Sequence, residues 1–404
     1  MDTSLFGQVQ VGIDQLFKSP HVSLLQGKKI GLITNQTAIN KDFLHTKELL
    51  KQGESRHEYQ LVALFAPEHG FYGHVAADER IEHSVDREKT PIYSLYGATR
   101  RPTAEMLEGI TLLIYDIQDI GSRPYTYATT LFYSMEEAAK RRIPVMVLDR
   151  PNPINGVVID GPMMEPEWRS IIGYINVPYC HGMTIGELAR FFNEEYRIGC
   201  QLSVVPMKDW NRSMTFIQTG LPWIPTSPNV PDCTTPLYYP ITGLLGELSF
   251  VSIGAALLPF RLVGSSWIDG VAFADYLNKQ SLTGVRFLPY CFRPLTGKYA
   301  KQDCQGAYII VTDPKHYQPF ATQAAIFGAL KHLYPEQMET SLKEVTNVQK
   351  RLFAQASGSE ETYRILKEMP HVIWPLRALH QKEREAFLNI RTKYLIPDYS
   401  MDAP

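Results

Sequence analysis

Short apolar runs that alternate with amphipathic stretches are the feature that most constrains the fold of this chain. The runs near the start of the chain are Lys29–Thr34, Leu61–Phe65, Leu112–Tyr115 and Val145–Leu148. Each is too short for an ordinary helix and almost free of charge, which is typical of parallel strands buried on both faces. Because helical stretches separate them, the pattern predicts an α/β domain built on a doubly wound parallel sheet.

The stretches between the strands carry recognisable helix signals. Tyr127–Arg142 repeats apolar residues at helical spacing and ends in a basic turn, as helix dipoles favour. Thr184 is followed three residues later by Glu187, which is a capping-box pattern at the start of a helix reaching Tyr196. Another strand is expected at Leu202–Val205, so the first domain is predicted to span residues 1–240.

A proline-rich segment separates this domain from the rest of the chain. The segment Gly220–Pro240 contains six prolines, which predicts a rigid connection without helix or central strand. Residues 241–404 are then predicted to form a smaller α+β domain that ends in helices. Its expected apolar runs are Phe250–Leu258 and Ala307–Val311, and its expected helices are Phe320–Tyr334, Ser341–Ala354 and Arg377–Tyr394.

Length and charge narrow the class of protein. At 404 residues with 44% hydrophobic content, the chain exceeds the size of one hydrophobic core, which favours two folded domains. Its 40 basic and 42 acidic residues leave a formal net charge of -2, without the basic surplus that a phosphate backbone requires. We therefore expect no nucleic-acid partner.

The cysteines and the N-terminal residues bear on the compartment. Five cysteines form an odd set without any C-x-x-C pair or histidine cluster, which favours reduced thiols over disulfides or a zinc site. The first twenty residues lack a basic segment followed by an unbroken apolar run, and no membrane span is visible. Unless a leader precedes the given chain, we expect a cytoplasmic protein.

Polar residues follow each of the first four predicted strands, where an open α/β sheet binds its ligands. Turn and capping chemistry would explain one or two such groups, but their presence at all four strand ends favours a site. They are Asn35 after the first strand, Glu68 and His69 after the second, Asp116, Asp119, Arg123, Tyr125 and Tyr127 after the third, and Asp149 to Asn152 after the fourth.

Missing motifs exclude several chemistries. The first strand-to-helix turn, TNQTAIN, lacks the glycines that let a backbone approach pyrophosphate, and no G-x-x-x-x-G-K-[ST] occurs. The G-x-S-x-G elbow and the H-E-x-x-H zinc pair are also missing. We therefore expect neither cofactor nor metal, and the remaining carboxylates, amides and tyrosines suit a carbohydrate site.

Glu68 is the leading candidate for a catalytic acid. It lies between Pro67 and His69, so it should occupy a tight strand-end turn where burial favours the protonated form that a general acid needs. Capping of the following backbone is the alternative. Asp116 and Asp119 could bind sugar hydroxyls, ligate a cation or cap a turn, and His181 could serve the site or pack its loop.

Several long segments resemble a bacterial family of exo-β-N-acetylmuramidases. They are PEHGF (67–71), YDIQDIGSRPYTY (115–127), LDRPNPINGVVIDGP (148–162), HGMTIGELARFFN (181–193) and GLPWIPTSPNVP (220–231), and the likeness continues to the C-terminus. The resemblance implies a Rossmann-like N-terminal domain, a smaller C-terminal domain and a cleft between them. It also implies hydrolysis of terminal N-acetylmuramic acid β-1,4-linked to N-acetylglucosamine in peptidoglycan fragments.

The resemblance assigns site residues as well. Glu68 falls on the family's catalytic glutamate, with His69 as its neighbour. The residues expected to bind substrate are Asn35, Asp116, Asp119, Arg123, Tyr125, Tyr127, Asn152, His181, Ser227, Asn229 and Glu247.

Three positions depart from the family, which usually carries arginine where this chain has Tyr72, Cys180 and Ala255. Arginine binds carboxylates with a bidentate fork, and muramic acid carries a lactyl carboxylate. The departures predict weak discrimination between muramic acid and N-acetylglucosamine, unless another clamp such as Arg123 replaces them.

Two other functions remain open from the residues. A non-catalytic receptor for cell-wall fragments would keep the cleft without turnover. A metal-dependent hydrolase would use Asp116, Asp119 and Asp149, and chelators would abolish its activity.

Overall fold

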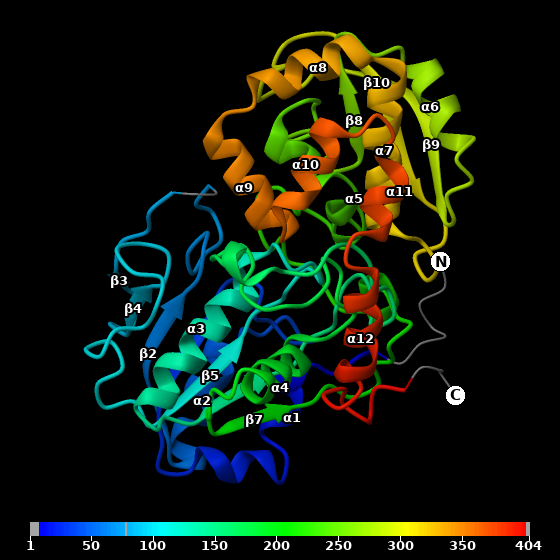
Figure 1. Ribbon diagram of the computed structural model, residues 1–404. Helices are drawn as coiled ribbons and strands as arrows, with labels where there is room; N and C mark the ends of the chain where they lie inside the picture. The colour runs from blue at the N-terminus through cyan, green and yellow to red at the C-terminus, as the bar shows by residue number, and fades with distance from the viewer. Residues whose placement is uncertain (1–7, 77–78, 401–404) are drawn as a thin grey trace.

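The computed structural model describes residues 8–76 and 79–400, arranged as two bodies stacked on one another (Figure 1). Residues 1–7, part of the segment from which the absence of a leader was expected, lie outside the described residues. The first body is built on a sheet in the order β3-β4-β2-β1-β5-β6-β7. Its strands are β1 Lys29–Thr34, β2 Gln60–Ala66, β3 Ser84–Val85, β4 Pro91–Ser94, β5 Leu112–Asp116, β6 Val145–Leu148 and β7 Leu202–Val205.

The order of the parallel strands is that of a Rossmann fold. All neighbouring pairs are parallel except β3 with β4. The chain builds outward from β1 through β2 to β4 and then crosses to the other side of β1 to form β5, β6 and β7. The reversal lies between β1 and β5, where such sheets open a crevice at the carboxyl ends of their strands. The expected fold class is confirmed.

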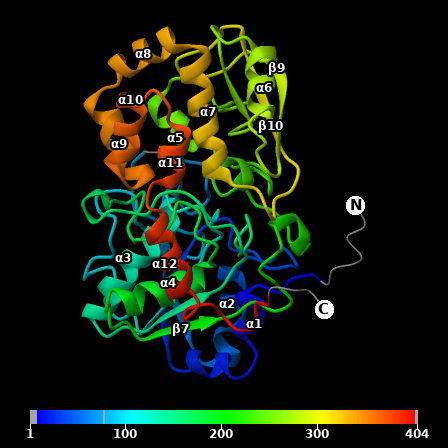
Figure 2. The same ribbon diagram turned by 45° about the vertical axis from the view of Figure 1, so that its right-hand side comes forward.

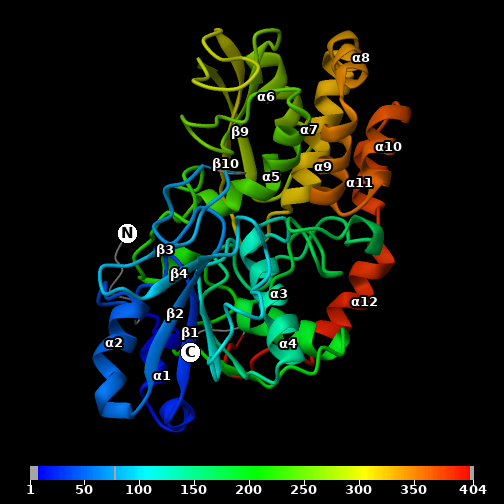
Figure 3. The ribbon, with the colours of Figure 1, turned by 90° about the vertical axis from the view of Figure 1, so that its left-hand side faces the viewer.

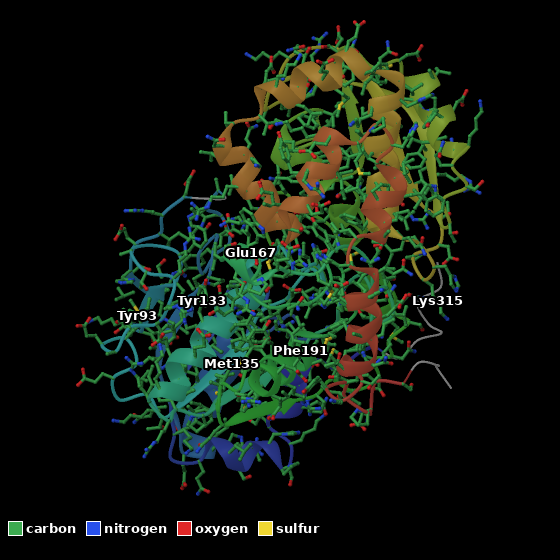
Figure 4. All side chains as sticks on the ribbon, in the orientation of Figure 1. Tyr93, Tyr133, Met135, Glu167, Phe191 and Lys315 are labelled. Carbon is green, nitrogen blue, oxygen red and sulfur yellow. The ribbon has the colours of Figure 1, made fainter. Side chains whose placement is uncertain are left out.

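Helices cover both faces of this sheet (Figure 3). Side chains of β5 alternate between two cores: Leu113 and Tyr115 belong to the core under α3 and α4, and Leu112 and Ile114 to the core under α1 and α2. Met135 and Phe191, labelled in Figure 4, are buried in the first of these cores. Burial of each Leu, Ile, Met or Phe side chain in these cores contributes about 1.5–3 kcal/mol. The helical segments of this body are α1 Gly12–Leu16, η2 His21–Leu25, α2 Thr46–His57, α3 Thr126–Lys140, η3 Pro166–Trp168, α4 Ile185–Glu195 and η4 Phe216–Thr219.

The second body is an α+β unit around an antiparallel sheet in the order β8-β10-β9. One large core joins this sheet to the helices that surround it. Its strands are β8 Leu262–Ser265, β9 Val285–Phe292 and β10 Cys304–Val311, and its helices are α5 Thr235–Leu248, α6 Gly270–Asn278, α7 Pro319–Leu333, α8 Pro335–Glu344, α9 Asn347–Ser357, α10 Glu360–Glu368 and α11 Ile373–Ala378. This is the smaller α+β unit that the sequence predicted.

The last helix returns to the first body. Helix α12, Gln381–Arg391, runs down beside α4 (Figures 1 and 2). Its Phe387 ring meets the ring of Phe191 at 5.8 Å, and Phe387 belongs to the core of the first body. The domain boundary expected at residue 240 stays a prediction.

The expectation that Gly220–Pro240 contains no helix is wrong, because α5 begins inside it at Thr235. Pro236 occupies the first turn, where the missing N–H would have no acceptor in any case. Pro240 lies inside the helix, at a cost of about 3 kcal/mol. Burial of the α5 side chains, Leu244 and Leu245 among them, offsets that cost.

Other boundaries of the second body also differ from the sequence prediction. The run Phe250–Leu258 forms no named strand, because β8 begins later at Leu262, and strand β9 was not predicted. Ser341–Ala354 spans the end of α8 and most of α9, since Thr346 caps a new helix with Gln349. Arg377–Tyr394 likewise spans two helices, α11 and α12.

Two further observations concern the surroundings of the protein. In residues 8–76 and 79–400, no helix combines the length and apolar character needed to cross a membrane. The five cysteines all lie within these ranges and are free thiols.

Candidate active site

The carboxyl ends of β2, β1, β5 and β6 lie side by side in the sheet. The register pairs Thr34 of β1 with Asp116 of β5 and Ile33 with Phe65 of β2. Residues that follow these strands therefore emerge along one edge, as the sequence predicted. Their side chains, however, form two groups. Some lie close to Glu68, and the others form hydrogen bonds that stabilise the loops after the strands.

Glu68 lies on a tight turn directly after β2. The turn is closed by the Gly70 N–H donating to the Pro67 carbonyl, and His69 and Gly70 both adopt left-handed backbone, at φ 68° and 78°. A non-glycine residue in this region stores strain, which is common at functional sites. The Glu68 side chain is 9% exposed, so the expected partly desolvated turn position is found.

His69 braces this turn. Its Nδ1 lies 2.8 Å from the Val75 carbonyl oxygen. Because a carbonyl can only accept, Nδ1 carries a proton and donates it to this hydrogen bond. His69 therefore fixes the loop after Glu68.

The start of helix α3 holds the Glu68 carboxyl. Thr126 is the first residue of α3, and its hydroxyl donates to Oε2 of Glu68 at 2.7 Å. Partial positive charge at a helix N-terminus attracts a carboxyl group. One oxygen of Glu68 is thus fixed by the first residue of α3.

Tyrosines surround Glu68 and are tied to the proline-rich segment. Tyr125 donates to the Thr226 hydroxyl at 2.8 Å, and Tyr127 donates to the Thr226 carbonyl. Ser227 also hydrogen-bonds the Tyr125 hydroxyl. Burial raises the pKa of Tyr125, and the charges of Asp119 and Glu68 raise it further, so this phenol stays protonated.

Tyr239 joins the two bodies at the same place. It lies on α5 and donates its hydroxyl to the Pro124 carbonyl at 2.9 Å, and its ring packs edge-on against that of Tyr125. Burial raises its pKa, and the carboxylates of Glu247, Glu68 and Asp119 add to the rise. These three acidic groups therefore act on one phenol.

Asp119 is a buried carboxyl within this cluster. Its Oδ2 accepts the Gly121 N–H at 2.9 Å, whereas buried Oδ1 has no hydrogen-bond partner, and the side chain is 7% exposed. Burial raises its pKa to about 7, opposed only in part by the N–H groups of Gly121 and Ile120. Gly121 is required in this turn, since its φ is 78° and a Cβ would lie 2.1 Å from Asn152 Oδ1.

Asp116 is engaged in a buried structural network. It forms an ion pair with Arg150 and accepts from the Thr46 hydroxyl. Arg150 also donates to the Ile39 carbonyl at 3.0 Å. Both oxygens of Asp116 are engaged in this network, so the structure lends no support to its expected role in sugar binding.

The other strand-end groups act mainly on their own loops. Asn35 Oδ1 accepts from the N–H and hydroxyl of Thr37, and its buried Nδ2 has no partner. Asn152 accepts from Ile154 N–H and donates to the Met183 carbonyl. His181 is buried with its pKa lowered to about 3 by burial, and its Nδ1 accepts from Met183. Of the two roles considered for His181, packing of its loop accounts for these contacts.

Arg123 ties the two bodies together. Its guanidinium donates to the carbonyls of Pro162 and Val177, each at 2.7 Å, and to those of Ala356 and Ser357 from α9. Burial lowers its pKa to about 10. With these donors committed to carbonyls, Arg123 is a structural residue, and the expectation of a replacement anion clamp is not supported.

The positions that depart from the family differ in exposure. Cys180 is 1% exposed and packed in the core of the second body, so it does not face a ligand. Tyr72 is 62% exposed. Ala255 is half-buried. Of the residues expected to bind substrate, Glu247 is half-buried and Asn229 is exposed.

Asp149, the third residue of the metal hypothesis, holds the start of α4. It accepts from the Thr184 hydroxyl at 2.7 Å, the Gly186 N–H at 2.8 Å and the Tyr399 hydroxyl at 2.8 Å. No group of three or more potential metal-ligating His, Cys, Asp or Glu side chains occurs in residues 8–76 and 79–400. The structure offers no grouping of Asp116, Asp119 and Asp149 for a metal.

Sequence reasoning missed Thr126, Thr226 and Tyr239 as members of this cluster. Thr126 and Thr226 lay inside quoted motifs but carried no chemistry that marked them. Tyr239 lay in the segment expected to form only a connection. Its proximity depends on α5 packing against the β5–α3 loop, which no local pattern indicates.

Comparisons with known proteins match one family over most of the chain. Models of the N-terminal and C-terminal parts of the exo-β-N-acetylmuramidase NamZ match residues 30–234 and 237–396. A peptidoglycan β-N-acetylmuramidase, NamZ of Bacillus subtilis strain 168, is 41% identical over 334 residues, which cover 82% of this chain and 80% of that protein.

Solved structures extend the likeness to the fold. A DUF1343 family protein from Bacteroides fragilis NCTC 9343 superimposes with a TM-score of 0.89 and 35% identity, covering 96% of this chain and 99% of its own. A second DUF1343 protein from the same strain gives a TM-score of 0.69 at 24% identity, covering 98% and 100%, which is a likeness of fold.

Proposed function

Because the chain belongs to the exo-β-N-acetylmuramidase NamZ family, we propose that it removes N-acetylmuramic acid from the non-reducing end of peptidoglycan fragments. The bond broken is the β-1,4 linkage to N-acetylglucosamine. The protein is a glycosidase, and its substrate is a sugar or muropeptide derived from the cell wall.

The observation that carries the proposal is the environment of Glu68. Its carboxyl is buried at a strand end, held through one oxygen by Thr126, and surrounded by Tyr125 and Tyr239. In the proposed hydrolysis, the Glu68 carboxyl donates a proton to the glycosidic oxygen as the C1–O bond breaks. Water supplies the hydroxyl group that bonds to C1 and releases the proton that restores the acid. The Thr126 hydroxyl fixes the orientation of the Glu68 carboxyl.

Other residues of the cluster are proposed to bind the sugar. Asp119 and Glu247 are proposed to accept hydrogen bonds from its hydroxyl groups. Ser227, which hydrogen-bonds Tyr125, and the exposed Asn229 are proposed to contribute from the proline-rich segment. Tyr125 and Tyr127 hold that segment through Thr226. His69 positions the Glu68 turn.

We further propose that the protein acts in the cytoplasm, on fragments returned during cell-wall recycling. Five free thiols support a reducing compartment. No bound cofactor is part of the proposed reaction, because acid catalysis and water are sufficient for hydrolysis of a glycoside.

The test is release of N-acetylmuramic acid from the disaccharide with N-acetylglucosamine, followed by mass spectrometry. Glu68→Gln keeps the shape but holds no transferable proton, and we expect at least about a hundredfold loss of kcat with folding preserved. Glu167→Gln is the matched control, because Glu167 is exposed on η3 (Figure 4).

Two results would contradict the proposal. Turnover of Glu68→Gln equal to wild type would show that another group supplies the proton. Binding of the disaccharide by wild type without any product would support the non-catalytic receptor instead.

A further inference from the structure

We propose that the exposed ring of Tyr72 is a platform for the departing N-acetylglucosamine, stacking against one face of its pyranose ring. The proposal rests on the proposed function and deepens it, since it assigns the binding position on the other side of the scissile bond.

Tyr72 is exposed but not loose. Its side chain is 62% exposed, yet its ring lies edge-on against Phe71 with centroids 5.0 Å apart. Phe71 in turn contacts the ring of His45 at 5.5 Å, and His74 flanks Tyr72 at 6.4 Å. One side of the ring is therefore braced by other aromatics while much of it faces solvent.

The loop that carries Tyr72 is anchored at both ends of its turn. Val75 N–H donates to the His69 carbonyl, closing the loop on itself. Gly73 packs so closely on Gln36 that a Cβ would lie 2.1 Å from the Gln36 amide, with φ at 70°. Gln36 donates to the Pro225 carbonyl at 2.8 Å, next to Thr226. The Tyr72 loop and the segment that holds Tyr125 are thus fixed to one another.

The place of Tyr72 relative to Glu68 indicates which sugar it meets. A catalytic acid lies at the glycosidic oxygen, between the terminal sugar and the departing one. The Glu68 carboxyl is buried among Tyr125, Tyr127 and Tyr239, which is the closed side that an exo-acting enzyme needs for a terminal sugar. Tyr72 follows Glu68 by four residues, on the loop that leaves the end of β2 (Figure 1), and it is 62% exposed, whereas Glu68 is buried. We therefore assign it to the departing sugar.

The Tyr72 ring and the pyranose ring of N-acetylglucosamine have complementary surfaces. The pyranose of a β-linked N-acetylglucosamine presents axial C–H groups on its faces, which pack on the electron-rich face of an aromatic ring. A rigid tyrosine provides large apolar area at low entropic cost because it has few rotatable bonds.

The experiment compares two substrates that share the terminal sugar. One is the disaccharide of N-acetylmuramic acid and N-acetylglucosamine, and the other is the β-fluoride of N-acetylmuramic acid, which has no departing sugar. We expect Tyr72→Ala to lower kcat/KM roughly tenfold more for the disaccharide than for the fluoride, the size expected for one aromatic contact. Tyr72→Phe should restore the wild-type ratio, since it keeps the ring.

The control variant is Trp374→Ala, because Trp374 is 73% exposed on α11 and lies outside the cluster around Glu68. It should leave the ratio of the two substrates at the wild-type value. Equal losses on both substrates for Tyr72→Ala, or no loss on either, would overturn the proposal.

A binding measurement separates this proposal from the proposed function. Saturation-transfer NMR with free N-acetylglucosamine should show contact of the sugar ring protons with wild type and a weaker signal with Tyr72→Ala. If wild type hydrolyses neither substrate, the proposed function fails, and the NMR comparison still decides the platform. Absence of sugar contact with wild type, or equal contact with both proteins, refutes it.

Discussion

The raised pKa of Asp119 makes the free energy of unfolding of this protein depend on pH. Burial raises its pKa to about 7 from an ordinary value of 3.8, and Oδ1 has no partner that would stabilise the charge. The folded state therefore binds a proton that the unfolded chain has already released over the range between these two values. Stability from this group is greatest at acid pH and is lost as pH rises through 7.

The magnitude follows from the two pKa values. Between pH 5 and pH 8 the linkage relation gives a loss of about 2–3 kcal/mol in the free energy of unfolding. Asp119→Asn carries no ionisable group, so it should escape this loss. Urea unfolding measures the free energy of unfolding of both proteins between pH 5 and pH 8. Over this range the value for wild type should fall by about this amount relative to the value for Asp119→Asn. A difference in stability that is the same at every pH does not affect this comparison.

Asp398→Asn is a suitable control, because Asp398 is exposed. Its stability should stay parallel to that of wild type over the same pH range. Parallel curves for wild type and Asp119→Asn would refute the reasoning, since they would mean that the buried carboxyl is as easily ionised as in the unfolded chain.

Three further outcomes are expected. Arg123→Gln should lower the free energy of unfolding by about 3 kcal/mol or more, because it strands buried carbonyls of both bodies; a loss under 1 kcal/mol in urea unfolding would contradict this tie. Cys180→Arg should reduce Tm and the yield of folded protein rather than raise selectivity for muramic acid, since the thiol is buried in a core; a variant as stable as wild type would show that the position can open. Incubation with EDTA should leave hydrolysis of the disaccharide unchanged, and loss of activity that zinc or magnesium restores would revive the metal hypothesis.

The sequence by itself determined the fold of the first body and the sheet edge at which its strand-end polar residues emerge. Apolar runs such as Leu112–Tyr115 must be buried on both faces, and their alternation with helices leaves few topologies other than a doubly wound sheet. Thr184 and Glu187 formed the expected capping box because caps are contacts between residues three positions apart. Glu68 follows β2 at this edge as predicted, because residues after parallel strands share one edge of the sheet, and its catalytic role stays a prediction.

Only the tertiary structure decided what each polar side chain does there. The partners of Arg123 include Ser357, 234 positions away, and the partner of Asp116 is Arg150 on the next strand end. Tyr239 reached the cluster through α5, a helix that its prolines argued against and that packing of its apolar side chains stabilises. Local patterns specify where the chain turns and which face is buried, whereas the direction and pairing of a buried polar group depend on residues distant in sequence.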